Sequence, residues 1–437
     1  MGRRDAVSSK HNSFIASDQY GFTGSKHYAR NTVVVEPDDG GDPIQDGSTS
    51  GERSVFKLNQ SGTVVWGYDA GTTAYGVSAV NGVAWAVGGT NSGWHGSPAA
   101  HADNNRTAWK LSRHGRLLST AFAGSTLYDV HTAEDGSAFV VGDRSTNGTG
   151  SNASLWKITA DGTVAWGYDT GGHLYHIYYH EGTGICYVAG IEVSNVSLWG
   201  IRDDGSSGTL ITTVDMGQQL TGIGGSTVGD GTGVQLLVCC SSAQADWPGN
   251  DGSGTDLRNV FRFAMVSGGL DALDPFDLII TPDTQGQAGP SGEPTVVGEE
   301  AYIMFGAGDD SIVRINSSGE EVDEGRVGDA PEACASDGTN IWVASRSWDL
   351  WSDPVGSLGG NLASVYKMPV EGLIPSHEPG VGTSGFGMDA GYTWGWDGTP
   401  KTVYTTTRAY DVWTDGSGYV WVGNIRDDYY KRLSSGP

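Results

Sequence analysis

The chain has 437 residues, of which 69 are glycine, and it carries 51 acidic against 25 basic residues, a formal net charge of −26. Such an acidic surface is poorly suited to nucleic acid, because phosphate contacts need basic patches. No apolar run approaches the roughly 18 residues that span a bilayer, and no apolar h-region follows the first residues. We therefore expect neither membrane insertion nor a secretory signal.

Residues 1–12 form a polar tail that is basic, whereas the rest of the chain is acidic. From residue 13 to 437 the chain alternates short runs rich in Val, Ile, Trp and Tyr with glycine-containing turns, which is typical of short β-strands. The clearest unit lies at 154–190, where Asp161-Gly162 is a hairpin signal between two extended runs. No sustained period near 3.6 residues favours helix.

One segment of this unit recurs eight times, at spacings between 43 and 64 residues. Its copies lie at 54–58, 107–111, 154–158, 197–201, 260–263, 312–315, 364–368 and 428–433. Four short strands repeated at this period are the signature of a β-propeller. The spacing predicts a blade at 74–124, a second at 127–171 and a third at 174–215.

The sequence therefore predicts an all-β fold, a single eight-bladed β-propeller over residues 13–437. The run Ser13–Asp18 resembles the fourth-strand run Val65–Asp69, so we expect this N-terminal strand to complete the C-terminal blade. Such a closure leaves no long free edge. A seven-bladed ring with a surplus strand is the alternative.

Lysine is scarce, and five of the eight lysines occupy the same position in the third strand of the repeat: Lys57, Lys110, Lys157, Lys367 and Lys431. We expect these cations to pair with an aspartate such as Asp69 or Asp169. The acidic composition resembles that of proteins from halophiles, in which strong salt screens self-repulsion. An ordinary acidic extracellular protein is the alternative.

The connections between second and third strands are unusually long at 36–52, 89–106, 241–257 and 346–363, and in a propeller they emerge on one face. They carry the aromatic residues Trp94, His95, Trp247, Trp348 and Trp351. Tryptophan is enriched at binding hot spots, so we expect a recognition surface for a protein partner or a glycan. The alternative is that each indole packs against the blade and holds its own loop in place. The tryptophans that follow the repeat are expected to pack inside the blades: Trp66, Trp85, Trp109, Trp156, Trp166, Trp199 and Trp421.

Three polar residues align with one another in first strands and are expected to face the channel mouth, where an ion could bind: Asp129, His176 and Asp411. The Asp-rich stretches 38–46 and 250–256 are candidates for structural Ca²⁺, although neither has an EF-hand pattern, and turn chemistry is the alternative. No nucleophile elbow, phosphate loop or HExxH pattern occurs in the sequence. We expect no organic cofactor and no catalytic residues.

The text Lys-Ile-x-x-Asp-Gly-x-Val-x-Trp-x-Tyr-Asp-Thr-Gly at 157–171 resembles the pyrroloquinoline-quinone-like propeller repeats. The resemblance covers 54–190 well and the other blades loosely, and it implies blade architecture rather than activity. Some members are quinoprotein dehydrogenases that keep a disulfide between adjacent cysteines near the cofactor. The pair Cys239-Cys240 invites that comparison, although it lies inside the strand-like run 235–240.

These features favour a non-enzymatic structural or binding propeller over an enzyme. An acidic propeller with tryptophan-bearing loops on one side resembles accessory or tail proteins of virions, here of a virus that infects a halophile. Its expected partners are proteins of a larger assembly or a cell-surface glycan. A secreted or surface adhesin of a halophilic cell is the first alternative, located outside the cell, and a quinoprotein-type dehydrogenase is the second.

Overall fold

The computed structural model describes residues 52–59, 64–90, 105–193, 196–215, 220–228, 233–244, 258–265, 292–298, 300–305, 312–316, 320–325, 331–345, 365–370, 409–414 and 419–428. All regular structure in these residues is β-strand. None of them belongs to a helix that is long and apolar enough to cross a membrane.

The described strands form seven antiparallel sheets. Three follow the chain directly: β3 (Ala74–Val80), β4 (Val83–Gly88), β5 (Ala108–Leu111) and β6 (Leu117–Ala121); β7 (Leu127–Thr132), β8 (Ala138–Ser145), β9 (Ala153–Ile158) and β10 (Val164–Tyr168); and β11 (Leu174–His180), β12 (Ile185–Val193), β13 (Val196–Asp203) and β14 (Gly208–Val214). These sheets confirm the three blades predicted between residues 74 and 215.

The next three sheets contain fewer described residues. They are formed by β15 (Leu220–Val228), β16 (Gly233–Gln244) and β17 (Arg258–Met265); by β18 (Thr295–Val297), β19 (Glu300–Met304), β20 (Ile312–Ile315) and β21 (Glu321–Gly325); and by β22 (Pro331–Ser336), β23 (Asn340–Ser345) and β24 (Val365–Pro369). The last sheet has the order β2-β1-β26-β25 and joins β1 (Glu52–Asn59) and β2 (Val64–Tyr68) to β25 (Ala409–Thr414) and β26 (Tyr419–Asp428).

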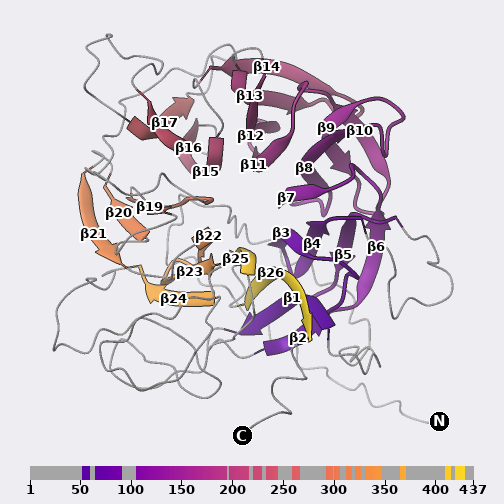
Figure 1. Cartoon of the computed structure of the whole chain (residues 1–437), viewed down its shortest axis with the longest axis horizontal. Coiled ribbons are helices and arrows are strands. Elements are labelled where there is room, and N and C mark those ends of the chain that lie inside the picture. Colours follow the sequence, from indigo (N-terminus) through magenta and orange to yellow (C-terminus); the bar gives the residue numbers. More distant parts are fainter. Residues whose placement is uncertain are drawn as a thin grey trace, which may run out of the picture.

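The sheets stand around a common axis, with one strand of each nearest the centre (Figure 1). The inner strands β3, β7, β11, β15, β18, β22 and β25 contact one another in this order, and β25 returns to β3. This arrangement is a β-propeller.

The ring is closed by other strands than those predicted. Strand β1 pairs with β26, for example Lys57 with Trp421, so two N-terminal strands complete the sheet that β25 and β26 begin. The run Ser13–Asp18 lies outside the described residues, and the single-strand closure proposed for it is not supported. Nor is the eight-bladed count, because the described strands make seven sheets. The seven-bladed alternative stays a prediction for the complete chain, because residues 266–291 and 371–408 are not described.

The apolar core lies between neighbouring sheets and is built from the repeat tryptophans. Trp85, Trp109, Trp156 and Trp421 are fully buried, and Trp66, Trp166 and Trp199 are nearly so. For example, Trp156 packs with residues of β3–β6 and β7–β10 in one cluster. The prediction that these tryptophans serve packing is confirmed.

The lysines of the third strands join neighbouring blades. Lys110 donates to the carbonyl of Ala160 at 2.9 Å, and its ammonium also lies over the ring of Trp85. Lys157 pairs with Asp203 at 2.5 Å. The prediction that Lys157 pairs with Asp169 is wrong, because Asp169 instead forms a bidentate ion pair with Arg144.

Candidate binding site at the mouth of the channel

Six of the seven inner strands contain a β-bulge at the same place near their start. In β7, for example, Leu127 pairs with Gly142 and Asp129 with Val141, so Tyr128 is left without a partner in the ladder. A bulge bends its strand and re-aims the extra side chain. The bulged residues are Tyr75, Tyr128, Tyr175, Thr221, Glu332 and Tyr410.

These six side chains line one cavity of about 470 Å³ on the axis of the ring. Four tyrosines from four consecutive sheets form an arc: the ring of Tyr75 lies 5.1 Å from that of Tyr410 and 5.9 Å from that of Tyr128, which lies 5.0 Å from that of Tyr175. Thr221 and Glu332 line the same cavity from other inner strands. The volume falls within the range of small-ligand sites.

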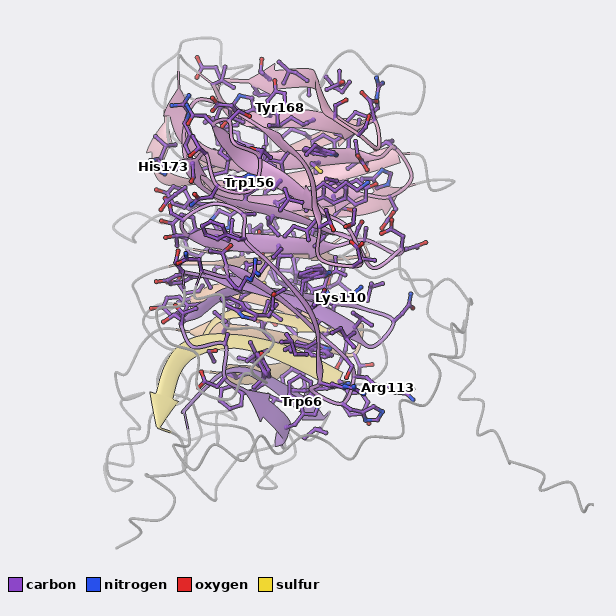
Figure 2. All side chains as sticks on the ribbon, turned by 90° about the vertical axis from the view of Figure 1, so that its right-hand side faces the viewer. Trp66, Lys110, Arg113, Trp156, Tyr168 and His173 are labelled. Atoms are coloured by element: carbon purple, nitrogen blue, oxygen red, sulfur yellow. The ribbon has the colours of Figure 1, made fainter. Side chains whose placement is uncertain are left out.

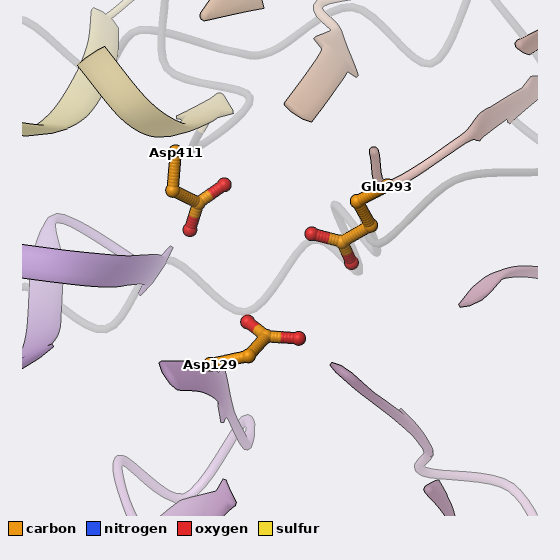
Figure 3. Close-up of side chains that lie close together, drawn as sticks. All are labelled: Asp129, Glu293 and Asp411. Carbon is orange, nitrogen blue, oxygen red and sulfur yellow. The ribbon is translucent and has the colours of Figure 1, made fainter. Parts of the chain in front are cut away.

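Three carboxylates converge in this cavity (Figure 3). Oxygen atoms of Asp129, Glu293 and Asp411 all lie within 4.8 Å of one another, and each residue is only 4% exposed. Asp129 and Asp411 follow the bulges of β7 and β25, whereas Glu293 lies just before β18 and bridges to Ala333 of β22. Residues from opposite sides of the ring thus place three acidic groups on the axis.

Backbone hydrogen bonds hold the two aspartates in place. Asp411 accepts hydrogen bonds from the N–H groups of Val412 (2.7 Å) and of Val77 in the neighbouring sheet (2.6 Å). Asp129 accepts hydrogen bonds from the N–H groups of Val130 (2.6 Å) and of Ile177 in the neighbouring sheet (2.8 Å). Each aspartate therefore fastens its own inner strand to the next one.

A glycine between the two aspartates makes their approach possible. Gly76 occupies the position after the bulge in β3, where β25 and β7 carry Asp411 and Asp129. A Cβ atom at Gly76 would lie 2.8 Å from the Cα of Asp129 and 2.9 Å from the carbonyl oxygen of Tyr128. No side chain fits there, so the carboxylates on either side meet over β3.

A second polar group lies next to the tyrosine arc. Tyr128 donates its hydroxyl hydrogen to Asp143 at 3.0 Å, and the Nδ1 atom of His173 lies 2.7 Å from the same oxygen. Burial raises the pKa of Tyr128 well above its usual range, and the charge and hydrogen bond of Asp143 raise it further. Tyr75 and Tyr175 also have raised pKa values, chiefly through burial. Tyr75, Tyr128 and Tyr175 are therefore neutral phenols at physiological pH.

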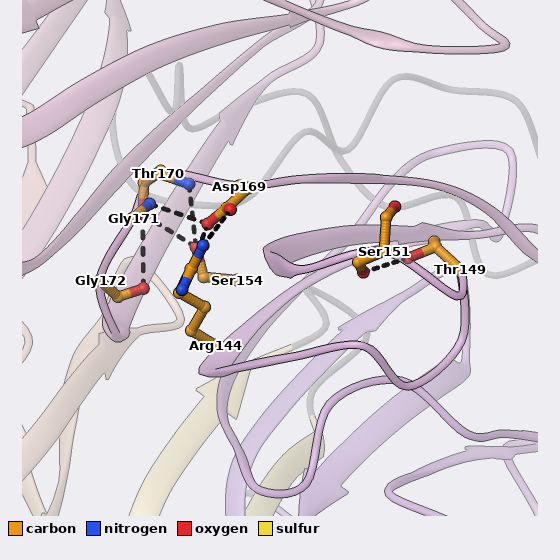
Figure 4. Close-up of polar contacts among 8 residues, drawn as sticks. All are labelled: Arg144, Thr149, Ser151, Ser154, Asp169, Thr170, Gly171 and Gly172. Carbon is orange, nitrogen blue, oxygen red and sulfur yellow. Dashed lines mark hydrogen bonds and ion pairs between the residues drawn. The ribbon is translucent and has the colours of Figure 1, made fainter.

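The neighbouring connection is fixed by an ion pair (Figure 4). Arg144 contacts both carboxylate oxygens of Asp169 at 2.7 Å, and Asp169 also accepts the N–H of Gly171 at 2.9 Å. These bonds lower the pKa of Asp169. His173 lies at one face of the ring and Arg113 at the opposite face (Figure 2). The cavity lies on the same face of the ring as His173, since Tyr128 in its lining and His173 both contact Asp143.

The sequence placed three residues at the mouth. The structure brings Asp129 and Asp411 together, and His176 lines the same cavity. Sequence reasoning missed Glu293 and the four tyrosines. The tyrosines had a signal, since each immediately precedes one of the aligned residues Gly76, Asp129, His176 or Asp411. Glu293 had no such signal, because the residues around it do not match the repeat sequence.

The predicted loop surface lies outside the described residues: Trp94, His95, Trp247, Trp348 and Trp351, together with the Asp-rich stretches 38–46 and 250–256. The strands that flank three of these loops nevertheless end at the mouth, because Gly88 pairs with Ala74, Cys240 with Leu220, and Ser345 with Pro331, all at the start of inner strands.

The chemistry of the mouth suits a positively charged ligand. Carboxylate oxygens are ligands for hard cations such as Ca²⁺, so Asp129, Glu293 and Asp411 are the described residues that could hold a metal ion. The quinoprotein comparison gains no support, because Cys239 and Cys240 form no disulfide with each other and are buried within β16. Burial also raises the pKa of Cys239, which makes its thiol unreactive.

A smaller cavity of about 30 Å³ lies at the far ends of β7 and β11 and is lined by His131, His180 and Glu181, among others. Burial lowers the pKa of His180 to about 4 and raises that of Glu181 to about 7. The Glu181 carboxylate accepts a hydrogen bond from the N–H of Glu134. This cavity holds little more than one water molecule.

No protein-family model matches the chain, and no curated protein matches it. Solved structures with a similar shape include the WD40 β-propeller domain of Doa1, with 10% identity, a TM-score of 0.49, and coverage of 86% of this chain and 94% of that one. Another is a putative 6-phosphogluconolactonase from Bacteroides uniformis, with 14% identity, a TM-score of 0.47, and coverage of 72% and 92%. These likenesses are too distant to carry an argument about activity. The propeller follows from the strands described above.

Proposed function

We propose that this chain is a non-enzymatic binding propeller that acts within a larger assembly through its mouth face. The observation that carries the proposal is the axial cavity of about 470 Å³, six of whose lining side chains project from bulges of inner strands. Because those strands are fixed by the ring, the cavity is preformed and costs little ordering on binding.

The lining favours binding over catalysis. Two of its carboxylates, Asp129 and Asp411, already accept two backbone N–H bonds each, which holds them in a structural role. The phenols beside them have raised pKa values and stay neutral.

The partner we propose is a protein of a virion or, as the alternative, of a cell envelope, or a glycan displayed there. The support is the net charge of −26, which suits a salt-rich environment and a basic partner, and the four tryptophans of the long loops. On this view Trp94, Trp247, Trp348 and Trp351 surround the mouth and enlarge its contact area. The salt-adapted part of the proposal predicts a melting temperature that climbs from low salt to molar KCl.

The test is a capture experiment with the purified full-length chain. The bait is incubated with virus particles or envelope fractions from cultures of the source organism, and bound material is quantified. Trp348→Ala and Trp247→Ala are expected to weaken capture at least about 10-fold, since a central aromatic hot spot contributes roughly 2 kcal/mol or more. Leu118→Ala, on the outermost strand β6, is the control and should leave capture unchanged. Equal capture by all four proteins would refute a role of the loop face.

A further inference from the structure

We propose that the tyrosine-lined cavity at the channel mouth binds a pyranose sugar ring, either as a free sugar or as the end of a glycan chain. The inference deepens the proposed function and rests on it, because it names the chemical group that the mouth of this binding propeller takes up.

The cavity is bounded by the whole ring. Its lining comes from the six inner strands β3, β7, β11, β15, β22 and β25 and from Glu293, just before β18, so each of the seven described sheets borders it. An extended peptide binds along an open groove or a sheet edge. A cavity on the axis favours instead a compact group that enters end-on, and about 470 Å³ gives room for roughly one or two sugar rings.

The tyrosine arc forms a curved aromatic wall of this cavity. Tyr410, Tyr75, Tyr128 and Tyr175 are all half-buried, with neighbouring ring centroids 5.0–5.9 Å apart. Neighbouring rings are inclined to each other by 51–76°, so no two of them form the parallel walls between which a flat aromatic ligand stacks.

A sugar ring fits such a wall better than a flat ligand does. It is puckered and carries C–H groups on both of its faces. The hydrogens of these groups are slightly positive, and the faces of aromatic rings are slightly negative, so the two attract each other weakly at each contact. An arc of four rings can supply several of these contacts to one ligand.

Two hydroxyl groups of the arc are available to a ligand. Among the residues that the structure describes, the hydroxyls of Tyr75 and Tyr175 have no hydrogen-bond partner. Burial raises the pKa of both phenols, so they stay neutral and can donate as well as accept. A purely apolar ligand would cover these hydroxyls and leave them unsatisfied, whereas the hydroxyls of a sugar can bond with them.

Tyr128 adds a third polar group between these two. Its hydroxyl donates to Asp143 at 3.0 Å, which leaves the phenol oxygen as an acceptor for a ligand hydroxyl. The Nδ1 atom of His173 lies 2.7 Å from the same oxygen of Asp143 and helps to hold that carboxylate in place. The wall thus combines aromatic surface with hydrogen-bond donors and acceptors, as a ring with several hydroxyl groups requires.

The inference is tested by saturation-transfer NMR of the full-length chain, with irradiation of the aromatic protons. The probes are the methyl glycosides of glucose, galactose, mannose and N-acetylglucosamine, and sorbitol is the control because it has similar hydroxyl groups but no ring. We expect saturable transfer to the ring C–H protons of at least one glycoside, in buffer with EDTA, and none to sorbitol. Tighter binding of the trisaccharide of that sugar assigns a glycan end, and tighter binding of the methyl glycoside assigns a free sugar.

Matched variants locate the site. Tyr175→Leu should weaken glycoside binding at least about 10-fold, because it removes a ring and a hydroxyl of the arc. Tyr175→Phe keeps the ring and should weaken binding about 3-fold. Tyr419→Leu is the control and should bind as the wild type does, since Tyr419 is exposed at the start of β26 and does not line the cavity.

Thermal melts show whether the variants fold. If Tyr175→Leu does not, the double variant Tyr75→Phe/Tyr175→Phe decides, because neither hydroxyl bonds to a described residue and their loss leaves the fold intact. Its expected loss of glycoside binding is about 10-fold. Unchanged binding by this double variant would then contradict the inference.

Four further results would overturn the inference: no saturable transfer to any glycoside, equal transfer to sorbitol, equal affinities of folded Tyr175→Leu and Tyr419→Leu, or glycoside binding that EDTA abolishes. If no glycoside binds while the wild type still captures virion or envelope material, the inference falls and the proposed function stands. If capture fails while a glycoside still binds, the proposed function falls and the sugar site remains.

Discussion

The two halves of the mouth use the same backbone feature for different chemistry. In β25, β3, β7 and β11 the bulged residue is always tyrosine, whereas in β15 and β22 it is Thr221 and Glu332. Between the latter two, Glu293 reaches the axis from the segment before β18. A symmetric scaffold thus carries an asymmetric site: all four tyrosines lie in one half, together with Asp129 and Asp411, and the other half, called the acidic half below, contributes Glu293 and Glu332. The backbone repeat fixes where side chains point, and the residue type alone decides what they bind.

The position after the bulge shows the same contrast. On the tyrosine side it is Asp411, Gly76, Asp129 and His176 in consecutive sheets, and the two aspartates fasten the next strand. On the other side it is Gly222 in β15 and Ala333 in β22. The aspartates therefore hold the tyrosine half together while contributing charge to the site.

The largest effect is expected from Gly76→Ala. The new Cβ atom would lie under 3.0 Å from two backbone atoms of β7, which cannot rotate away as a side chain could. We expect a loss of about 3 kcal/mol in the free energy of unfolding, at the upper end of overpacking costs. Ala333→Gly is the matched control at the same register position in the acidic half, and it should cost about 1 kcal/mol. Urea unfolding of both variants measures the difference, and equal losses would contradict this account of Gly76.

Asp411→Ala should have the next largest effect. It leaves the N–H groups of Val77 and Val412 without their carboxylate acceptor, and an unsatisfied buried donor costs about 1–3 kcal/mol. Relief of repulsion with Asp129 and Glu293 offsets part of this, so we expect a net loss of about 2 kcal/mol. Glu332→Ala, in the acidic half, should change the unfolding free energy by less than about 0.5 kcal/mol. A thermal melt in which both variants match the wild type would exclude the fastening role of Asp411.

The repeated parts of this site could be predicted from the sequence, and the unrepeated parts could not. Asp129 and Asp411 were placed at the mouth because their first strands align with each other. Glu293 was not predicted, because it lies before β18, a strand of three residues that does not match the repeat sequence. The tyrosines stood at a regular position, but a tyrosine in a strand usually packs, and only the bulge turns these four toward the axis.

The closure of the ring was beyond sequence reasoning for another reason. The run 13–18 and the strands β1 and β2 have similar local patterns, so local propensity cannot rank them as partners of β26. The pairing of Lys57 with Trp421 joins residues far apart in the chain and is decided by the packing of the whole ring. The lysine partner was mistaken in the same way, because Asp203, which binds Lys157, lies in the following sheet.

A smaller effect is expected from Tyr128→Phe. The change removes the hydrogen bond to Asp143 but keeps the ring in the arc, so we expect a loss of about 1 kcal/mol in unfolding free energy. Ultraviolet titration should also show one fewer late-ionising phenol, because burial and Asp143 raise the pKa of Tyr128. A titration curve that matches the wild type would contradict the contact between Tyr128 and Asp143.

The smallest net effect is expected from pH in the wild type, at the far ends of β7 and β11. The pKa of His180 falls from 6.5 to about 4, so its contribution to stability is complete above pH 6.5 and is lost as pH falls toward 4. The pKa of Glu181 rises from 4.5 to about 7, so its contribution is complete below pH 4.5 and is lost as pH rises through 7. Between pH 4.5 and 6.5 the two contributions to stability change with pH in opposite directions and largely cancel.

Two variants separate these contributions. Relative to the wild type, His180→Gln should lose stability as pH rises, and Glu181→Gln should gain stability as pH rises. Urea midpoints at pH 4.5, 5.5 and 6.5 measure both slopes, and because the other carboxylates contribute equally to all three proteins, only the differences matter. Slopes that match the wild type in both variants would mean that neither residue titrates abnormally, and that the far end of β11 is as open to water as an ordinary surface turn.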